Sequence, residues 1–214
     1  MSQKRAPART VAKRQSKGGY WIDHAEIVED DLEWLAKGER LTLWNVHVPR
    51  GFLAQLDKLW WLDLRGGSAA DVAVARGANK LRYLAVNQVR GLSDLSVVSE
   101  LTNLRYLGFY GLPKVTHLPS CAALSRLERA ELGQMRGLVT LAGLLEAPNL
   151  RELQFARKIN VTDDDVDGIV NHPTIERFGW FAEDVPVETW VPVVERIGLP
   201  EVSYIHPEKW FSLE

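Results

Sequence analysis

The sequence predicts an α/β solenoid, in which repeated units stack side by side and share one curved parallel sheet. Four windows with a common pattern begin at Leu81, Leu104, Leu127 and Leu150, a constant spacing of 23 residues. Within each window the first, fourth and sixth positions are apolar, and the alternation over positions four to six is typical of a half-buried strand. A fixed period in the twenties indicates units that bury their apolar faces only against their neighbours.

The repeat frame divides the chain into four parts. We expect a disordered basic tail over residues 1–18, an N-terminal cap over 19–37, repeats over 38–182 and a C-terminal cap over 183–214. The formal net charge of the whole chain is −2. Without the six basic residues of the tail, 20 basic and 28 acidic residues remain, which is −8 for the rest. The six are Lys4, Arg5, Arg9, Lys13, Arg14 and Lys17.

This charge distribution restricts the nucleic-acid hypothesis to one segment. An acidic folded body disfavours a nucleic-acid groove on the fold, so nucleic acid or another acidic surface would bind only through residues 1–18. An acid-free, Arg-containing leader is also compatible with an organellar transit peptide. No apolar stretch has the length of a secretory signal or of a membrane span, so a cytoplasmic location is expected.

The elements before and between the repeats follow from local signals. In the N-terminal cap, Glu29, Asp30 and Asp31 favour the first turn of a short helix that ends before Gly38. The sheet should hold about seven strands. They are Leu41–Trp44, Leu59–Arg65, Leu81–Asn87, Leu104–Tyr110, Leu127–Gly133, Leu150–Ala156 and Ile175–Phe181.

The return segments carry apolar residues with a period of three, as in Leu92, Leu95, Val98 and Leu101. This period predicts a convex side that is mostly 3₁₀ helix and irregular structure. Two returns differ. Residues 65–79 have small side chains and predict a thin unit, whereas residues 161–173 predict a true helix with Thr162 as its N-cap.

The C-terminal cap loses the repeat period. Pro186–Ile197 is predicted to be a helix, closed by Gly198, and Val202–Ile205 a last strand. Trp190, Trp210 and Phe211 are expected to cover the C-terminal end of the core.

The windows resemble leucine-rich repeats with short, 22–23-residue units, of the bacterial, internalin-like or regulatory-subunit-like subclass. The family pattern Leu-x-x-Leu-x-Leu is present at Leu59–Leu64, and with Val or Phe in the last place at Leu81, Leu104 and Leu150. The resemblance implies a right-handed horseshoe with helical caps that binds proteins on its concave sheet, and it implies no catalytic residues. The chain departs from the family at the ninth position, which lacks the inward Asn or Cys. That position holds Gly67, Val89, Leu112, Met135 and Lys158.

Positions three, five and seven of each strand point away from the core and form the candidate binding surface. Large aromatic residues and Arg are typical of interaction hot spots, and folding does not require them on an outer face. Two alternatives remain open: the aromatics stabilise neighbouring strands, or the N-terminal cap folds over them. The candidate binding residues are Trp44, Trp61, Asp63, Arg65, Tyr83, Asn87, Tyr106, Tyr110, Arg129, Glu131, Glu152 and Arg177.

Catalytic and metal sites are not predicted. The acidic run that starts at Asp163 resembles half of a calcium loop, but its twelfth position is Thr174, where a bidentate Glu is needed. Cys121 occupies an inward position and behaves as a buried hydrophobe. Glu131 and Glu152 on adjacent strands have the spacing of a glycosidase pair. A charge cluster with Arg129 and Arg177 explains them more simply.

The sequence therefore predicts a monomeric, non-catalytic protein-binding module without cofactor or metal. It would act as an adaptor, a scaffold or an inhibitor of another protein. One alternative is an immunity-type inhibitor of a toxin, and another is attachment to nucleic acid or an acidic surface through residues 1–18.

Overall fold

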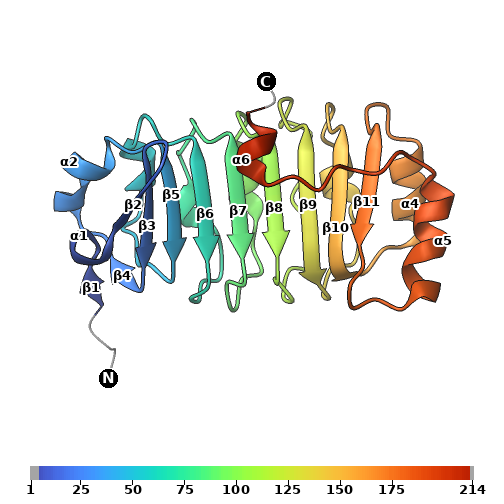
Figure 1. Cartoon of the computed structure of the whole chain (residues 1–214), viewed down its shortest axis with the longest axis horizontal. Helices are drawn as coiled ribbons and strands as arrows, with labels where there is room; N and C mark the ends of the chain where they lie inside the picture. The colour runs from blue at the N-terminus through green and yellow to red at the C-terminus, as the bar shows by residue number, and fades with distance from the viewer. Residues whose placement is uncertain (1–4, 213–214) are drawn as a thin grey trace.

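The fold is one long parallel sheet backed by short helical turns, as seen in a computed structural model that describes residues 5–212 (Figure 1). The strand order is β11-β10-β9-β8-β7-β6-β5-β3-β2, parallel from β3 to β11 and antiparallel only between β2 and β3. The strands are β2 (Lys13–Gln15), β3 (Gly19–Asp23), β5 (Arg40–Trp44), β6 (Trp61–Arg65), β7 (Tyr83–Asn87), β8 (Tyr106–Tyr110), β9 (Arg129–Met135), β10 (Glu152–Ile159) and β11 (Arg177–Phe181).

The seven predicted strands correspond to β5 through β11, but six of them begin two residues later than predicted. The first apolar residue of each window lies in the corner before the strand. The Leu81 and Leu104 amides, for example, donate to carbonyls three residues earlier, Ala78 and Leu101, as in a tight turn. Their side chains are nevertheless fully buried. The repeated Leu therefore fills the corner of each unit and belongs to the core without being part of the strand.

The prediction of a disordered tail is wrong for residues 5–18. β1 (Ala6–Pro7) pairs with β4 (Ala25–Glu26), α1 (Ala8–Val11) follows, and β2 extends the main sheet beyond β3. Ala8 is fully buried in the core. All three residues of β2 are exposed, and two of them are cations, which protect an open sheet edge from pairing with other chains. Residues 1–4 of the predicted tail lie outside the described residues.

The N-terminal cap continues with η1 (Glu29–Asp31) and α2 (Leu32–Leu35). Asp31 fixes this turn, because its carboxylate accepts hydrogen bonds from the Val28 amide at 3.0 Å and the Trp34 indole at 2.8 Å. Leu35 is fully buried against the first units of the solenoid. The cap region thus supplies both a lid and the additional strand β3.

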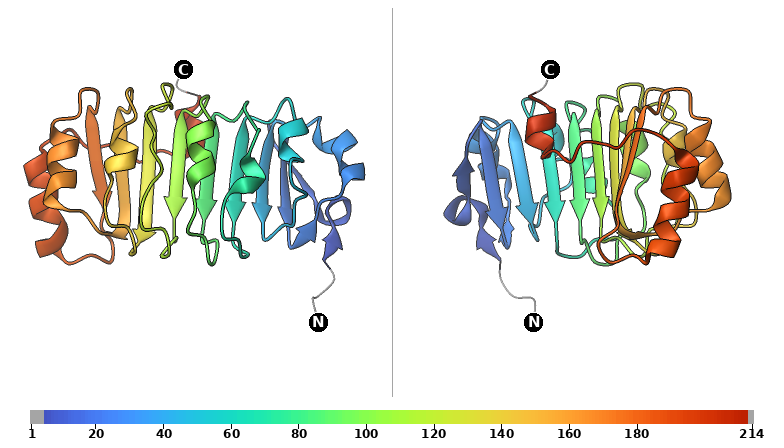
Figure 2. Two further views of the ribbon diagram at one scale, coloured as in Figure 1. Left: turned by 180° about the vertical axis from the view of Figure 1, so that it is seen from behind. Right: turned by 45° about the vertical axis from the view of Figure 1, so that its right-hand side comes forward.

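On the side opposite the sheet's open face, the repeats before α4 carry short helical turns (Figure 2). They are η2 (Leu53–Gln55), η3 (Ala73–Ala75), η4 (Ser96–Glu100) and α3 (Ala142–Leu145). Three of these turns are 3₁₀ helices, as the period of three predicts, whereas α3 is α-helical. The predicted helix after residue 161 is α4 (Asp163–Val170), and Thr162 Oγ1 caps it by accepting from the Asp165 amide at 3.1 Å.

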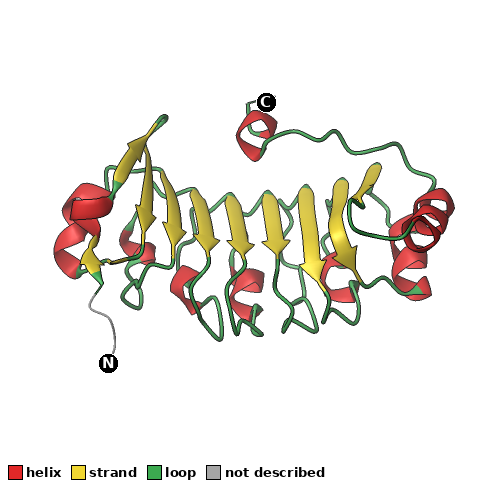
Figure 3. Ribbon diagram, turned by 60° about the horizontal axis from the view of Figure 1, so that its bottom comes forward, coloured by secondary structure: helices red, strands yellow, loops and turns green. Residues whose placement is uncertain are grey.

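α5 (Val187–Ile197) packs against α4 at the end of the solenoid and ends at Gly198, whose φ is 63°. The chain then turns back over the sheet and reaches α6 (Pro207–Trp210) above its middle strands (Figure 3). The predicted last strand, Val202–Ile205, is wrong, because this stretch has no regular structure. Residues 213–214 of the C-terminal cap lie outside the described part.

Within residues 5–212, none of the helices has the length and apolar character needed to cross a bilayer.

Candidate functional site: the concave face

The strand register arranges the outward side chains in three rows across the open face of the sheet, here called the concave face. The first row is Arg40, Trp61, Tyr83, Tyr106, Arg129, Glu152 and Arg177. The middle row is Thr42, Asp63, Ala85, Gly108, Glu131, Gln154 and Gly179. The last row, at the carboxyl ends of the strands, is Trp44, Arg65, Asn87, Tyr110, Gly133, Ala156 and Phe181. All twelve candidate residues fall in these rows.

Three aromatic residues of the first row form a continuous stack. The Trp61 and Tyr83 rings are parallel within 15°, with centroids 3.6 Å apart, and Tyr106 follows at 5.1 Å from Tyr83. They were expected to be exposed, and this is wrong: their exposed fractions are 6%, 5% and 1%. The cover is α6 and the residue after it. Trp210 meets Tyr106 edge-on at 5.5 Å, and Phe211 lies 6.0 Å from Trp61.

The predicted place of Trp210 and Phe211 at the end of the core is therefore also wrong. A cap does cover the concave aromatics, and it comes from the C-terminus. Trp210 and Phe211 lie outside the repeats, so the repeat period could not predict their position over the sheet.

Arg40 is a residue of the first row that the sequence analysis did not include among the candidates. It begins β5, one residue before the predicted strand, and its register partner is Trp61. Its guanidinium lies 4.5 Å from the Trp61 ring centroid and 4.8 Å from that of Trp60, and Nη1 is 2.7 Å from Glu208 Oε1 in α6. Aligning the first strand with the later ones would have placed Arg40 in the first row.

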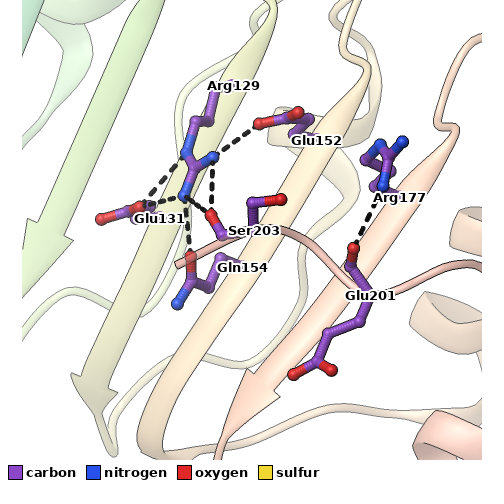
Figure 4. Close-up of polar contacts among 7 residues, drawn as sticks. All are labelled: Arg129, Glu131, Glu152, Gln154, Arg177, Glu201 and Ser203. Atoms are coloured by element: carbon purple, nitrogen blue, oxygen red, sulfur yellow. Dashed lines mark hydrogen bonds and ion pairs between the residues drawn. The ribbon is translucent and has the colours of Figure 1, made fainter. Parts of the chain in front are cut away.

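Arg129 organises the charged half of the face (Figure 4). Its Nη1 donates to Glu152 at 2.6 Å, and its Nη2 donates to Glu131 at 2.7 Å and to Gln154 at 2.8 Å. The same guanidinium approaches the Ser203 carbonyl of the C-terminal segment at 3.4 Å. Arg129 was expected at the surface, but its exposed fraction is 0%.

Electrostatics keep Arg129 charged in spite of burial. Burial alone lowers its pKa, but Tyr106, Glu131 and Glu152 together raise it above the ordinary value. Because one guanidinium binds both carboxylates, the arrangement fits an ion-pair cluster better than a catalytic carboxylate pair. Arg177, in contrast, is exposed, and among the described residues its side chain donates only to the Glu201 carbonyl, at 3.4 Å (Figure 4).

Asp63 holds two residues of the last row in place. Its carboxylate accepts hydrogen bonds from Arg65 Nε at 2.8 Å and from Asn87 Nδ2 at 2.9 Å, and its exposed fraction is 3%. The guanidinium of Arg65 also lies 5.4 Å from the Trp21 ring centroid. Asp63 is thus a buried support, whereas Arg65 and Asn87 remain half-buried at the surface.

The last row is a part of the candidate surface that α6 leaves uncovered. Trp44 is 37% exposed and Phe181 is 53% exposed, while Arg65, Asn87 and Tyr110 are half-buried. Trp44 rests against Trp21, with ring centroids 6.0 Å apart. Aromatic side chains and an arginine therefore remain accessible along one edge of the face.

A hollow of 180 Å³ lies between the last row and the covered stack. Small residues Ala85 and Gly108 line it together with Tyr106, Tyr110 and Glu131. Within the described part of the chain, the Tyr106 hydroxyl is buried without a hydrogen-bond partner. Burial, followed by the Glu131 charge, raises the pKa of Tyr106, so the hydroxyl stays neutral. The nearby carboxylate does not reach it with hydrogen-bonding geometry.

The other chemical candidates have structural roles. Burial raises the pKa of Cys121 to about 12, and its exposed fraction is 1%. The Asp165 carboxylate, part of the calcium-like run, accepts from the Thr140 hydroxyl at 2.9 Å, the Leu141 amide at 2.7 Å and the Thr162 amide at 3.0 Å. The portion of the chain described here contains no group of three or more His, Cys, Asp or Glu side chains placed to hold a metal ion.

Comparisons with known proteins found similarity in structure but not in sequence. No protein-family model matches the chain, and no curated protein matches it in sequence. Among solved structures, an internalin from Listeria monocytogenes matches over 86% of this chain and 73% of its own, with 14% identity and a TM-score of 0.34. At that TM-score the similarity supports no functional argument.

Proposed function

We propose that this protein is a non-catalytic protein-binding module, acting as an adaptor or an inhibitor through the uncovered last row of the concave face. The observation that carries this proposal is the hollow beside Tyr110, with accessible Trp44 and Arg65 in the same row. Aromatic residues and arginine dominate the energetics of protein interfaces. Core packing does not require them at these outward positions.

The size of the hollow favours a protein partner over a small molecule. Small-molecule sites usually have volumes of about 300–1,000 Å³, whereas this hollow measures 180 Å³. It fits a single side chain of a partner. A polar atom on that side chain would also provide the hydrogen bond that the buried Tyr106 hydroxyl lacks, and such an unmade bond costs about 1–3 kcal/mol.

The alternative of nucleic-acid binding through residues 1–18 is less favoured. It requires a mobile basic segment, whereas residues 6–15 form β1, α1 and β2 on the body of the protein. The immunity-type inhibitor remains a narrower form of the same proposal, since it would use the same surface.

The test is capture of a partner from the native cell extract by crosslinking, with wild type and two variants. Gly108→Val fills the floor of the hollow, and a Cβ at Gly108 meets only Ala85 at an ordinary 3.7 Å, so the fold should tolerate it. Tyr110→Ala removes one wall. Val139→Ala, at an exposed apolar residue outside the three rows, is the matched control.

We expect both concave variants to lose at least about tenfold in capture of a defined partner, since one hot-spot contact is worth 2 kcal/mol or more. The Val139→Ala control should capture the partner as the wild type does. Equal capture by all four proteins would overturn the proposed surface.

A further inference from the structure

We infer that the covered aromatic stack is a docking site for a protein segment that carries a carboxylate two residues before a pair of adjacent aromatic residues. In the free protein, its own C-terminal segment, residues 199–212, occupies this site as an internal ligand. The inference rests on the proposed function in that both place a partner on the concave face. It concerns the first row, however, and is tested separately.

The receptor side of the site is independent of the core that holds the solenoid together. Trp61, Tyr83, Ala85 and Tyr106 form their own cluster on the concave face, separate from the main core between the sheet and its convex turns. Trp60, Trp210 and Phe211 complete this second cluster. Because the outward positions do not fill the main core, the aromatic stack has no part in closing it.

The C-terminal segment contacts the site through one charged group and two aromatic rings, as a bound peptide would. Glu208 forms an ion pair with Arg40, and Trp210 and Phe211 place their rings on the stack through edge-on contacts. Arg40 is 6% exposed and lies over two indole rings. A buried, oriented cation beside an aromatic platform selects an anion and an aromatic ring at a fixed separation.

Beyond Pro200 the segment makes few polar contacts with the sheet, although the Val202 side chain is buried. Within the described chain, its last main-chain hydrogen bond to the sheet joins the Pro200 carbonyl to the Phe178 amide, at 3.0 Å. The Glu201 and Ser203 carbonyls then receive only long contacts of 3.4 Å from arginine side chains. Tyr204 is 84% exposed.

The docked end of the segment is also shallow. α6 has four residues, and so short a helix is not stable on its own in water. Trp210 and Phe211 stay half-buried, although the rings beneath them are almost fully buried. Among residues 199–212, release would break the Arg40–Glu208 ion pair, the arginine contacts to the Glu201 and Ser203 carbonyls, and the ring and cation–π contacts of Trp210 and Phe211. None of these contacts belongs to the main core.

The segment occupies this shallow site because it is covalently attached to the same chain. A short flexible connection gives an effective concentration in the millimolar range, so a segment with micromolar intrinsic affinity fills the site nearly all of the time. A partner segment in solution competes against that concentration. Disabling the internal ligand should therefore strengthen binding in trans by at least about tenfold.

The experiment uses a fluorescein-labelled synthetic peptide of residues 199–212 and the full-length chain, with fluorescence anisotropy as the readout. The proteins compared are the wild type and the double variant Trp210→Ala/Phe211→Ala. The control peptide carries the same two alanine substitutions. Circular dichroism checks that the double variant folds. If it does not fold, Glu208→Lys replaces it, because this change reverses the charge that faces Arg40 without removing the aromatic cover.

We expect the double variant to bind the native peptide at least about tenfold more tightly than the wild type does, with no binding of the alanine peptide. Equal affinity of the double variant for the two peptides would overturn the docking site. Equal affinity of the wild type and the double variant for the native peptide would overturn the internal occupancy. Neither result bears on Gly108→Val, so failure here and failure of the proposed function are distinguishable.

Discussion

Arg129 and Glu152, on the neighbouring strands β9 and β10, form an ion pair of 2.6 Å, and the arginine is completely buried. Removing a partner from a buried pair costs about 3–5 kcal/mol, because a charge is left without compensation. The two carboxylates here keep 33% and 22% of their side-chain surface exposed, so water compensates part of the loss. We therefore expect Arg129→Ala to lower the free energy of unfolding by about 2–3 kcal/mol in urea denaturation.

Arg177→Ala is the matched control for that measurement. Arg177 occupies the same row two strands away, but it is exposed, and within residues 5–212 it makes one long hydrogen bond, to the Glu201 carbonyl. Its loss should change the free energy of unfolding by less than about 0.5 kcal/mol. Similar losses in both variants would mean that the Arg129 cluster does not stabilise the sheet.

Asp165 is expected to stabilise the junction between α4 and the preceding unit. Its carboxylate accepts hydrogen bonds from the buried Leu141 amide and from the amide of Thr162, the N-cap residue of α4, and each buried donor left without a partner costs about 1–3 kcal/mol. Asp165→Ala should therefore lower the free energy of unfolding by about 2–4 kcal/mol. Asp164→Ala, at an exposed position of the same turn, should change it little. Equal losses of unfolding free energy in the two variants would mean that negative charge at the helix N-terminus, and not the hydrogen bonds of Asp165, stabilises the junction.

The sequence predicted the repeating part of the fold because each unit repeats the same local chemistry. The Leu of every window recurs in an identical corner, and the period of three in the returns matches short 3₁₀ turns. The helix of Asp163–Val170 was also predictable, since Thr162 and Asp165 form a local capping pair. These features depend on neighbours within one or two units.

The candidate site was less predictable because it depends on contacts between distant parts of the chain. The outward positions of Trp61, Tyr83 and Tyr106 followed from strand alternation, but their burial depends on Trp210 and Phe211, which belong to no repeat. The folding of residues 6–15 likewise depends on β3 and β4, and their basic composition indicated only solvation. The amino-acid composition of a segment indicates how well water solvates it. It does not indicate whether the segment pairs with the edge of a sheet elsewhere in the chain.

Cys121 should remain unreactive in the folded protein and make the stability depend on alkaline pH. Burial raises its pKa from an ordinary value of 9.0 to about 12. Between these values the unfolded chain loses the proton and the folded chain keeps it, so stability falls as the pH rises. Urea denaturation between pH 8 and 11 should therefore show a smaller decline for Cys121→Ala than for the wild type. A thiol reagent that reacts rapidly with the native protein at pH 8 would contradict this.

A partly open pocket of 230 Å³ lies beside the thin unit at residues 65–79, and Val72, Val74 and Val89 form part of its apolar lining. One extra buried methylene is worth about 0.8 kcal/mol where space exists. We expect Val89→Ile to raise the free energy of unfolding by about 0.5–1 kcal/mol. Val98→Ile makes the same chemical change at a fully buried position that does not line the pocket. Overpacking at Val98 should lower the free energy of unfolding by about 1–3 kcal/mol. A gain in stability for Val89→Ile with a loss for Val98→Ile would place the free volume beside the thin unit. A change in the same direction in both variants would contradict this.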